Sequence, residues 1–494
     1  MNGRFKHIGL VSVGAVAGIL ISLGITAVAQ RDTRLPLPLD ELRQFSDVFG
    51  AIKANYVEPV EDKKLITEAI SGMLSGLDPH SAYLDADAFK ELQVGTQGEF
   101  GGLGIEVGVE DGFVKVIAPI EDTPAARAGI KAGDLIIKID EKPTKGLALN
   151  DAVKLMRGKP KSQVVLTVSR KGESRPVVIP IVRDVIRVQS VKSKLLEPGY
   201  GYLRITQFQE HTVENLVKHI DGLAKQGPLK GLVLDLRNDP GGLLNGAVGV
   251  SAAFLPPKVV VTSTDGRTED AKRKFLATPE DYLRGTREDF LQKLPAMTRT
   301  VPMVVLVNGG SASASEIVAG ALQDHKRAVV MGTQTFGKGS VQSILPLTNN
   351  TAIKLTTARY FTPSGRSIQA KGITPDLLVE ETPEGDISGA FRVREADLSR
   401  HLANPKDAEA KPAAPRPAAT EANIEALKDR KPIEFGSADD FQLQQAMNHL
   451  KGKPVMIAKA KPESGETTPG ADDAAKPDAT KATEDADTRK PGKD

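Results

Sequence analysis

The chain has 494 residues, which is too long for one compact core and suggests about three domains. Its formal net charge of +2 gives no support for nucleic-acid binding or for a polybasic membrane surface. The absence of cysteine excludes a thiol nucleophile, disulfide bonds and cysteine-ligated zinc, but it does not identify the cellular compartment.

Residues 1–29 have the pattern of an export signal. Two basic residues precede an uncharged, mostly apolar run from 8 to 29, and this run ends in Ala-Val-Ala, which is typical of a cleavage site. The pattern favours a signal peptide cleaved after Ala29. The run is also long enough to span a bilayer as an uncleaved anchor. Both interpretations predict a periplasmic or otherwise extracytoplasmic protein, anchored to the inner membrane if the segment stays in place.

Two regions of different periodicity follow. Residues 30–97 carry apolar residues at helical spacing and predict an N-terminal helical region. From residue 98 to 184 the pattern changes to short strands separated by turns, with one amphipathic helix near 147–158 and a hairpin after it. This region is predicted to be a β-rich domain.

The third region, residues 185–398, alternates strands with helices, which predicts an α/β domain with a largely parallel sheet and a site at the strand ends. After this the composition becomes rich in alanine, proline and charged residues. Residues 399–494 are therefore predicted to be a mostly disordered tail. An amphipathic helix near 439–452 interrupts the tail and is expected to dock on the core or on a second subunit.

The β-rich region begins with a glycine-rich loop that runs into a strand. Backbone N–H groups in such a loop can hold a carboxylate, and the edge of the strand can pair with an extended peptide. The order of the elements resembles a PDZ domain, and the resemblance implies that the loop binds a substrate carboxylate. The loop residues are Gly101, Gly102, Leu103, Gly104 and Ile105.

Ser313 lies at the predicted start of a helix directly after the apolar strand 303–307. With Glu316 it matches a capping box, which is usually only structural. The start of a helix also favours a developing oxyanion, so Ser313 is a candidate nucleophile that still needs a base. No histidine fits a Ser-His-Asp motif or a zinc pattern, and His325 is expected about 18 Å from Ser313 along the same helix.

A lysine is the alternative base, since burial can lower its pKa enough to accept the serine proton. Lys338 lies in a glycine-flanked loop that should come near the start of the helix, because the strands on either side of that helix are expected to be neighbours. Gln342, four residues further on, could orient the amine. Without further context, both residues can equally be ordinary polar residues of a loop and a strand.

Residues 309–347 resemble the active-site block of the carboxyl-terminal processing peptidases, also called tail-specific proteases. This block contains the segments SASASE, ALQD and FGKG in the family's order. Three further segments support the resemblance: GLDPHSAYL (76–84), LDLRNDPGGLL (234–244) and YFTPSGRSIQAKGITPD (360–376). The resemblance covers about residues 40–380.

The resemblance implies a crotonase-like α/β protease core with an inserted PDZ domain and no metal or organic cofactor. It assigns Ser313 as nucleophile, Lys338 as general base and Gln342 as its orienting partner. The backbone N–H groups of Ala314 and of Gly241 or Gly242 would form the oxyanion hole. The implied function is cleavage of proteins at or near their C-termini.

The implied partners are proteins or peptides with free C-termini, with an adaptor protein left open and a homo-oligomer expected. Asp324 falls where some relatives have a functionally important aspartate, although closing the end of its helix is the simpler interpretation. Two other function classes are disfavoured. A non-catalytic PDZ scaffold is disfavoured by the intact Ser313, Lys338 and Gln342 set, and an acyl-CoA enzyme by the export signal and the PDZ region.

Overall fold

The computed structural model describes residues 37–110, 112–120, 122–284, 288–383, 393–405 and 434–457. The expected signal peptide and most of the expected disordered tail lie outside these residues. Within the described residues, no helix combines the length and the apolar character that crossing a membrane requires. The chain divides into two compact units, residues 1–83 and 84–494, which are described separately.

The first unit contains two helices, α2 (Leu39–Asn55) and α3 (Asp62–Ser75), followed by the short strand β1 (Ala82–Leu84). No residue of α2 is buried. Its larger apolar side chains recur at helical spacing and form one exposed stripe. The stripe consists of Leu39, Leu42, Phe45, Val48 and Ile52.

The second unit begins with α4 (Ala86–Gln97), and the β-rich domain follows. Strand β2 (Glu99–Gly102) pairs with β9 (Asp184–Arg187), so the two ends of the domain lie together. Between them, the main sheet has the order β3-β4-β5-β7-β8, and β6 (Lys142–Pro143) pairs with β5. These strands are β3 (Ile105–Glu110), β4 (Phe113–Pro119), β5 (Leu135–Ile139), β7 (Gln163–Ser169) and β8 (Val177–Val182). Helices α5 (Pro124–Arg127) and α6 (Leu149–Met156) complete the domain and contribute to its own apolar core.

The α/β region is built on a six-stranded sheet with the order β10-β11-β12-β15-β16-β19. Strand β10 is antiparallel to β11, and the others are parallel. The two central strands are buried at every residue and apolar except for Asp235 at the end of β12, as expected for a sheet covered on both faces. The strands are β10 (Val191–Glu197), β11 (Tyr200–Ile205), β12 (Gly231–Asp235), β15 (Met303–Val307), β16 (Val329–Gly332) and β19 (Leu377–Leu378).

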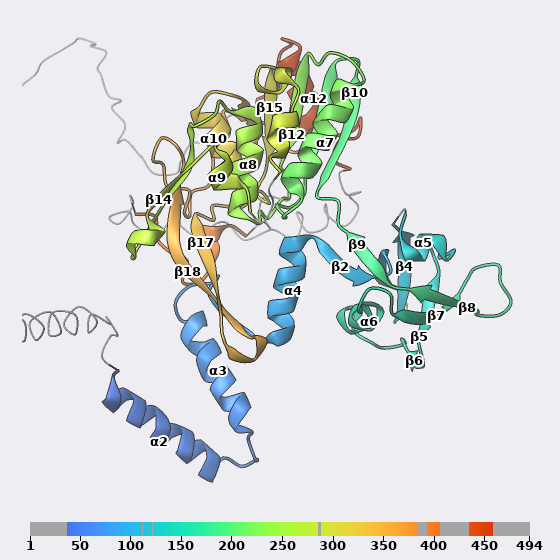
Figure 1. Cartoon of the computed structure of the whole chain (residues 1–494), viewed down its shortest axis with the longest axis vertical. Coiled ribbons are helices and arrows are strands. Elements are labelled where there is room, and N and C mark those ends of the chain that lie inside the picture. The colour runs from blue at the N-terminus through green and yellow to red at the C-terminus, as the bar shows by residue number, and fades with distance from the viewer. Residues whose placement is uncertain are drawn as a thin grey trace, which may run out of the picture. The chain divides into compact units, whose positions relative to one another are not determined.

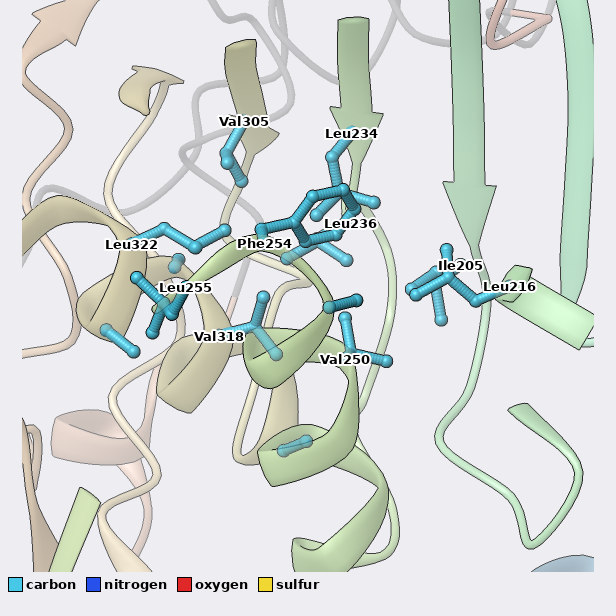
Figure 2. Packing of buried hydrophobic residues seen from close by; sticks show 14 of the residues in the cluster. Ile205, Leu216, Leu234, Leu236, Val250, Phe254, Leu255, Val305, Val318 and Leu322 are labelled. Carbon is cyan, nitrogen blue, oxygen red and sulfur yellow. The ribbon is translucent and has the colours of Figure 1, made fainter. Parts of the chain in front are cut away.

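Alternate side chains of the central strands enter two different cores. Leu234 and Val305 pack on one face with helices α7 (Thr212–Ala224), α8 (Leu244–Phe254) and α10 (Ala314–Asp324). Figure 2 shows this packing around Val250, Phe254, Val318 and Leu322. The opposite face packs against α12 (Phe441–Leu450), a helix from the C-terminal part of the chain (Figure 1).

A second, antiparallel group of strands extends from this region, with β17 paired to β18, β18 to β13 and β13 to β14. Its strands are β13 (Val260–Gly266), β14 (Arg273–Leu276), β17 (Ser340–Pro346) and β18 (Ala352–Phe361). The remaining short helical elements are η1 (Glu269–Ala271), α9 (Pro279–Tyr282), η2 (Phe290–Lys293), η3 (Ala296–Arg299), η4 (Thr348–Asn350) and η6 (Glu395–Asp397).

The parallel pairing fixes where a site can form. Strands β12, β15 and β16 run in the same direction, so their carboxyl ends lie at one edge of the sheet. The loops that follow them, residues 236–243, 308–313 and 333–339, start from this edge. They contain all the protease-site residues predicted from the sequence except Ala314 and Gln342, which lie in α10 and β17.

Candidate active site

Ser313 is the N-cap of α10 and has an unusual backbone conformation, with φ 56° and ψ −112°. A positive φ is rare for a residue with a side chain, and such strain is common at active sites. The surrounding structure holds it in place: the Ser313 N–H donates to Glu316 Oε2 at 2.8 Å, and its carbonyl accepts from the N–H of Ile317. Ser313 is half-buried while Ala314, next to it, is buried.

Glu316 is fully buried and accepts four hydrogen bonds. Its Oε2 binds the N–H of Ser313 and, at 2.9 Å, the N–H of Lys338. Its Oε1 binds the Thr335 hydroxyl at 2.5 Å and the N–H of Gly337 at 2.7 Å. Burial raises the pKa of Glu316 to about 7, although each of these bonds lowers it. One carboxyl group therefore joins the nucleophile turn to the loop that carries the candidate base.

Lys338 is half-buried at the end of this loop, immediately before β17. Its carbonyl accepts a hydrogen bond from the hydroxyl of Tyr360 in β18. Burial raises the pKa of Tyr360, and a hydrogen bond with the Ser313 side chain partly offsets this. The buried phenol therefore contacts both the candidate nucleophile and the main chain of the candidate base.

Gln342 lies in β17 beside Thr356 of β18, next to a register shift between Val341 and Gln342. Its side-chain amide donates to Ser340 Oγ at 3.0 Å and to Thr356 Oγ1 at 3.3 Å. These bonds fix the amide plane at the start of the strand that follows Lys338.

The two glycines expected near Ser313 have different hydrogen bonds. The Gly241 N–H donates to Asp239 Oδ1 at 2.9 Å, so it already has a partner. The N–H groups of Gly242 and Ala314 donate to no group in the described part of the chain. A Cβ on Gly241 would lie 2.8 Å from Ser313 Cβ and 2.8 Å from Ala314 N, so the two loops touch there. Gly242 and Ala314 thus supply the free donors.

The two serines that flank Ser313 are fully buried and bond to the loop after β12. Ser311 Oγ donates to the carbonyl of Leu236 at 2.8 Å. Ser315 Oγ donates to the carbonyl of Asp239 at 2.9 Å. Neither hydroxyl is oriented for nucleophilic attack. They attach the turn that carries Ser313 to the glycine loop, a role that sequence reasoning missed and that the alternating Ser-Ala pattern could have indicated.

Asp239 is a buried acid beside this arrangement. Its Oδ2 has no hydrogen-bond partner among the residues that the structure describes. Burial raises its pKa to about 8. A neutral side chain at this position adds no buried negative charge beside the glycine loop.

Asp324 lies at the last residue of α10, away from Ser313. Its Oδ2 accepts the N–H of Ser364 at 2.9 Å, and its Oδ1 forms an ion pair with Arg366 at 2.5 Å. It therefore holds the loop after β18 and does more than close its own helix. Two of the histidines have their own partners: His219 contacts Ser193 Oγ, and His325 contacts the carbonyl of Val260.

The glycine-rich loop of the β-rich domain connects β2 to β3. Gly101 and Gly102 are paired with β9, and Leu103 is buried in the domain core. The carbonyl of Gly104 accepts from Ile120 N and Thr123 Oγ1, whereas the N–H groups of Leu103 and Gly104 have no partner within the described ranges. The loop therefore presents free donors where a carboxylate would bind. Among the described residues, no group of three or more acidic, histidine or cysteine side chains could hold a metal ion.

Three family models match parts of this chain. Residues 199–379 match peptidase family S41, residues 101–181 match the PDZ domain, and residues 14–88 match the activating protease CtpB N-terminal domain. A carboxy-terminal-processing protease of Bartonella bacilliformis is 44% identical over 444 residues, covering 89% of this chain and 95% of that protein. The carboxy-terminal processing protease CtpA of Bacillus subtilis is 36% identical over 386 residues, covering 77% of this chain and 78% of that protein.

A solved structure, the photosystem II D1 C-terminal processing protease, is 31% identical, with 72% of this chain and 92% of that chain covered and a TM-score of 0.39. The family models and the two relatives define a serine peptidase that carries a PDZ domain. The chain belongs to peptidase family S41, and its relatives there are carboxy-terminal processing proteases. The predicted fold class, an α/β protease core with a PDZ domain and an N-terminal helical region, is confirmed. The exact domain boundaries remain predictions.

Proposed function

We propose that this chain is an exported serine endopeptidase that cleaves proteins at or near their C-termini with Ser313 as nucleophile and Lys338 as base. The observation that carries the proposal is the shared contact of both residues with Glu316: the N–H groups of Ser313 and Lys338 donate to the same carboxyl oxygen. This contact holds the two main chains together at the start of a helix, where developing negative charge is stabilised.

The reaction then follows acyl-enzyme chemistry. Neutral Lys338 Nζ accepts the proton of Ser313 Oγ as the oxygen attacks the scissile carbonyl carbon. The carbonyl oxygen becomes an oxyanion that accepts hydrogen bonds from the free N–H groups of Gly242 and Ala314. The C–N bond breaks as the leaving amine takes the proton from Lys338, and a water then hydrolyses the ester by the same base. Gln342 orients the lysine amine in this scheme.

The PDZ domain would supply substrate selection. Free N–H groups of Leu103 and Gly104 suit a C-terminal carboxylate, while the edge of β3 suits an extended peptide. Proteins or peptides with a free C-terminus are thus the proposed partners. The exposed apolar stripe of α2 supports self-association, and the basic and apolar N-terminal sequence supports export.

The test is cleavage of an unfolded protein with an apolar C-terminus by wild type, Ser313→Ala and Lys338→Ala. We expect both variants to lose activity by a factor of about 10³ or more while keeping the wild-type melting temperature. Activity that survives both substitutions would reject the mechanism. Amidation of the substrate C-terminus should weaken binding, and equal affinity for the amidated substrate would reject carboxylate capture.

A further inference from the structure

The C-terminal segment 434–457 is attached to the core by a buried arginine. Arg237 follows β12 and is 1% exposed. Its five N–H donors all have acceptors: two bonds go to Asp235, two to Asp440 and one to Gln442, at 2.6 to 3.0 Å. Asp440 and Gln442 belong to the C-terminal segment, so three of the five bonds come from a part of the chain about 200 residues away.

The charges of this cluster are balanced only when the segment is docked. Asp235 and Asp440 are buried, and they face Arg237 and the partly buried Arg204. The Phe435 ring covers both guanidinium groups at 4.4 and 4.5 Å. The pKa of Arg237 is raised because its bonds to the two aspartates outweigh its burial. Removing Asp440 would leave a buried cation with half of its partners.

Arg237 is also the first residue of the link to the glycine loop. Its N–H donates to Asp235 Oδ1 at 2.9 Å, and its carbonyl accepts from Arg204 at 3.1 Å, so its main chain is fixed on both sides. The next residue, Asn238, has a φ of 54° and exchanges two 2.9 Å hydrogen bonds with Asn308, which lies in the loop before Ser313. Gly242 follows four residues later. The position of Arg237 therefore determines where the glycine loop begins.

We propose that Asp440 and Gln442 of the C-terminal segment hold Arg237 as a positioning residue for the loop that carries Gly241 and Gly242. The inference deepens the proposed function and rests on it, because it assigns the oxyanion donor to that loop. The segment acts within one chain. Its loss would displace an oxyanion donor without touching Ser313, Lys338 or the PDZ domain.

The test compares substitutions in the full-length protein. Asp440→Asn removes the charge that faces Arg237 and keeps the size of the side chain. Leu443→Ala lies on the same helix and weakens its apolar contact with the sheet, but Leu443 has no bond to Arg237. Steady-state kcat and KM are measured for an unstructured peptide with a free C-terminus, together with melting temperatures and with peptide affinity in a Ser313→Ala background.

We expect Asp440→Asn to lower kcat about tenfold, with KM and peptide affinity within twofold of wild type, because a displaced donor affects only the transition state. Leu443→Ala should keep kcat within twofold of wild type, even if its melting temperature falls as far as that of Asp440→Asn. Asp440→Glu, which retains the charge, should recover part of the loss. If Asp440→Asn does not fold, Gln442→Leu provides the same comparison, with an expected loss of about threefold because it removes one neutral acceptor.

Equal losses of kcat in Asp440→Asn and Leu443→Ala would overturn the inference, since activity would then follow stability alone. An unchanged kcat in Asp440→Asn would overturn it too. Failure of the proposed function would give a different result, namely activity that persists in Ser313→Ala. The two failures are therefore read from different variants.

Discussion

The proposed protease site and the proposed carboxylate loop of the PDZ domain both present backbone N–H groups, but they hold them in opposite ways. Around Ser313, buried side chains of Glu316, Ser311 and Ser315 bond the surrounding main chain from several directions. In the PDZ loop, Gly104 is held by its carbonyl alone. The difference fits their proposed roles. Stabilising a transition state needs donors that are fixed in advance, whereas a flexible peptide end can bind to a loop with fewer constraints.

The largest effect is expected at Glu316, where one carboxyl group organises two loops. In Glu316→Gln, one carboxyl oxygen is replaced by an NH2 group. This group cannot accept the hydrogen bonds of the two N–H or O–H donors that face it. We expect kcat to fall about 100-fold, because two buried donors lose their acceptor and each unsatisfied buried group costs about 1–3 kcal/mol. Steady-state kinetics check this, with circular dichroism to confirm folding. Thr335→Ser retains its hydroxyl and should stay near wild type; a Glu316→Gln enzyme within threefold of wild type would contradict the role of Glu316.

This central role of Glu316 was beyond sequence reasoning. The S-x-x-E pattern predicted its bond to the N–H of Ser313, and the structure has that bond. Its bonds to Thr335, Gly337 and Lys338 depend on the parallel pairing of β15 with β16, which brings the loop after β16 to the same sheet edge. The pairing itself was predictable from two apolar runs that flank one helix. Which loop atoms would meet the carboxylate was not, because that depends on backbone conformation.

Other parts of the fold show the same limit. Strand β10 was not anticipated, since its alternating lysines and serine resemble a solvated loop and only its antiparallel pairing with β11 identifies it. No sequence pattern distinguishes Arg237 from an ordinary charged residue after a strand, yet it is among the most deeply buried large side chains. Its partner Asp440 is too distant in sequence for any local pattern to connect the two. Local periodicity predicts elements, whereas long-range polar contacts require the folded chain.

The next effect concerns the PDZ loop. Gly104 has a φ of 77°, and a Cβ there would lie 2.3 Å from Thr123 Cβ, so Gly104→Ala must displace the loop. We expect the dissociation constant of a C-terminal peptide to rise about tenfold, measured by calorimetry in a Ser313→Ala background. The same substitution at Gly95, a helical glycine with open space around it, should leave affinity unchanged. Unchanged affinity in Gly104→Ala would show that this loop does not bind the peptide.

A smaller effect is expected from the serines beside Ser313. Ser315→Ala leaves the carbonyl of Asp239 with one donor fewer, and Ser311→Ala removes bonds to both Leu236 and Asn308. Each should lower the free energy of unfolding by about 1–3 kcal/mol and reduce kcat about fivefold. Denaturant unfolding and steady-state kinetics measure the two quantities. Ser251 is the matched control: its hydroxyl is buried in α8 without a partner, so Ser251→Ala should be neutral or stabilising. Losses as large in Ser251→Ala would refute the positioning role.

The smallest effect is a pH dependence of stability set by Asp239, whose pKa burial raises to about 8 from an ordinary 3.8. The folded protein then keeps a proton that the unfolded chain releases near pH 4, so the free energy of unfolding falls as pH rises from about 4 to about 8. Glu316, with a pKa of about 7, contributes in the same direction only up to that pH. The interval above pH 7 therefore reports mainly on Asp239.

Asp239→Asn should flatten this interval and should exceed wild-type stability at pH 8.5 by at least about 1.4 kcal/mol, the value of one pKa unit. Urea unfolding at pH 5, 7 and 8.5 measures it. Asp324→Asn provides the control of opposite sign. Burial raises the pKa of Asp324, but its bonds to Thr362, Ser364 and Arg366 lower it overall, so its contribution is lost only below about pH 4. If the Asp239→Asn protein keeps the wild-type slope of unfolding free energy against pH between pH 7 and 8, the carboxyl group beside the glycine loop does not titrate there. The hydrogen bonds of the site would then hold it together without that buried proton.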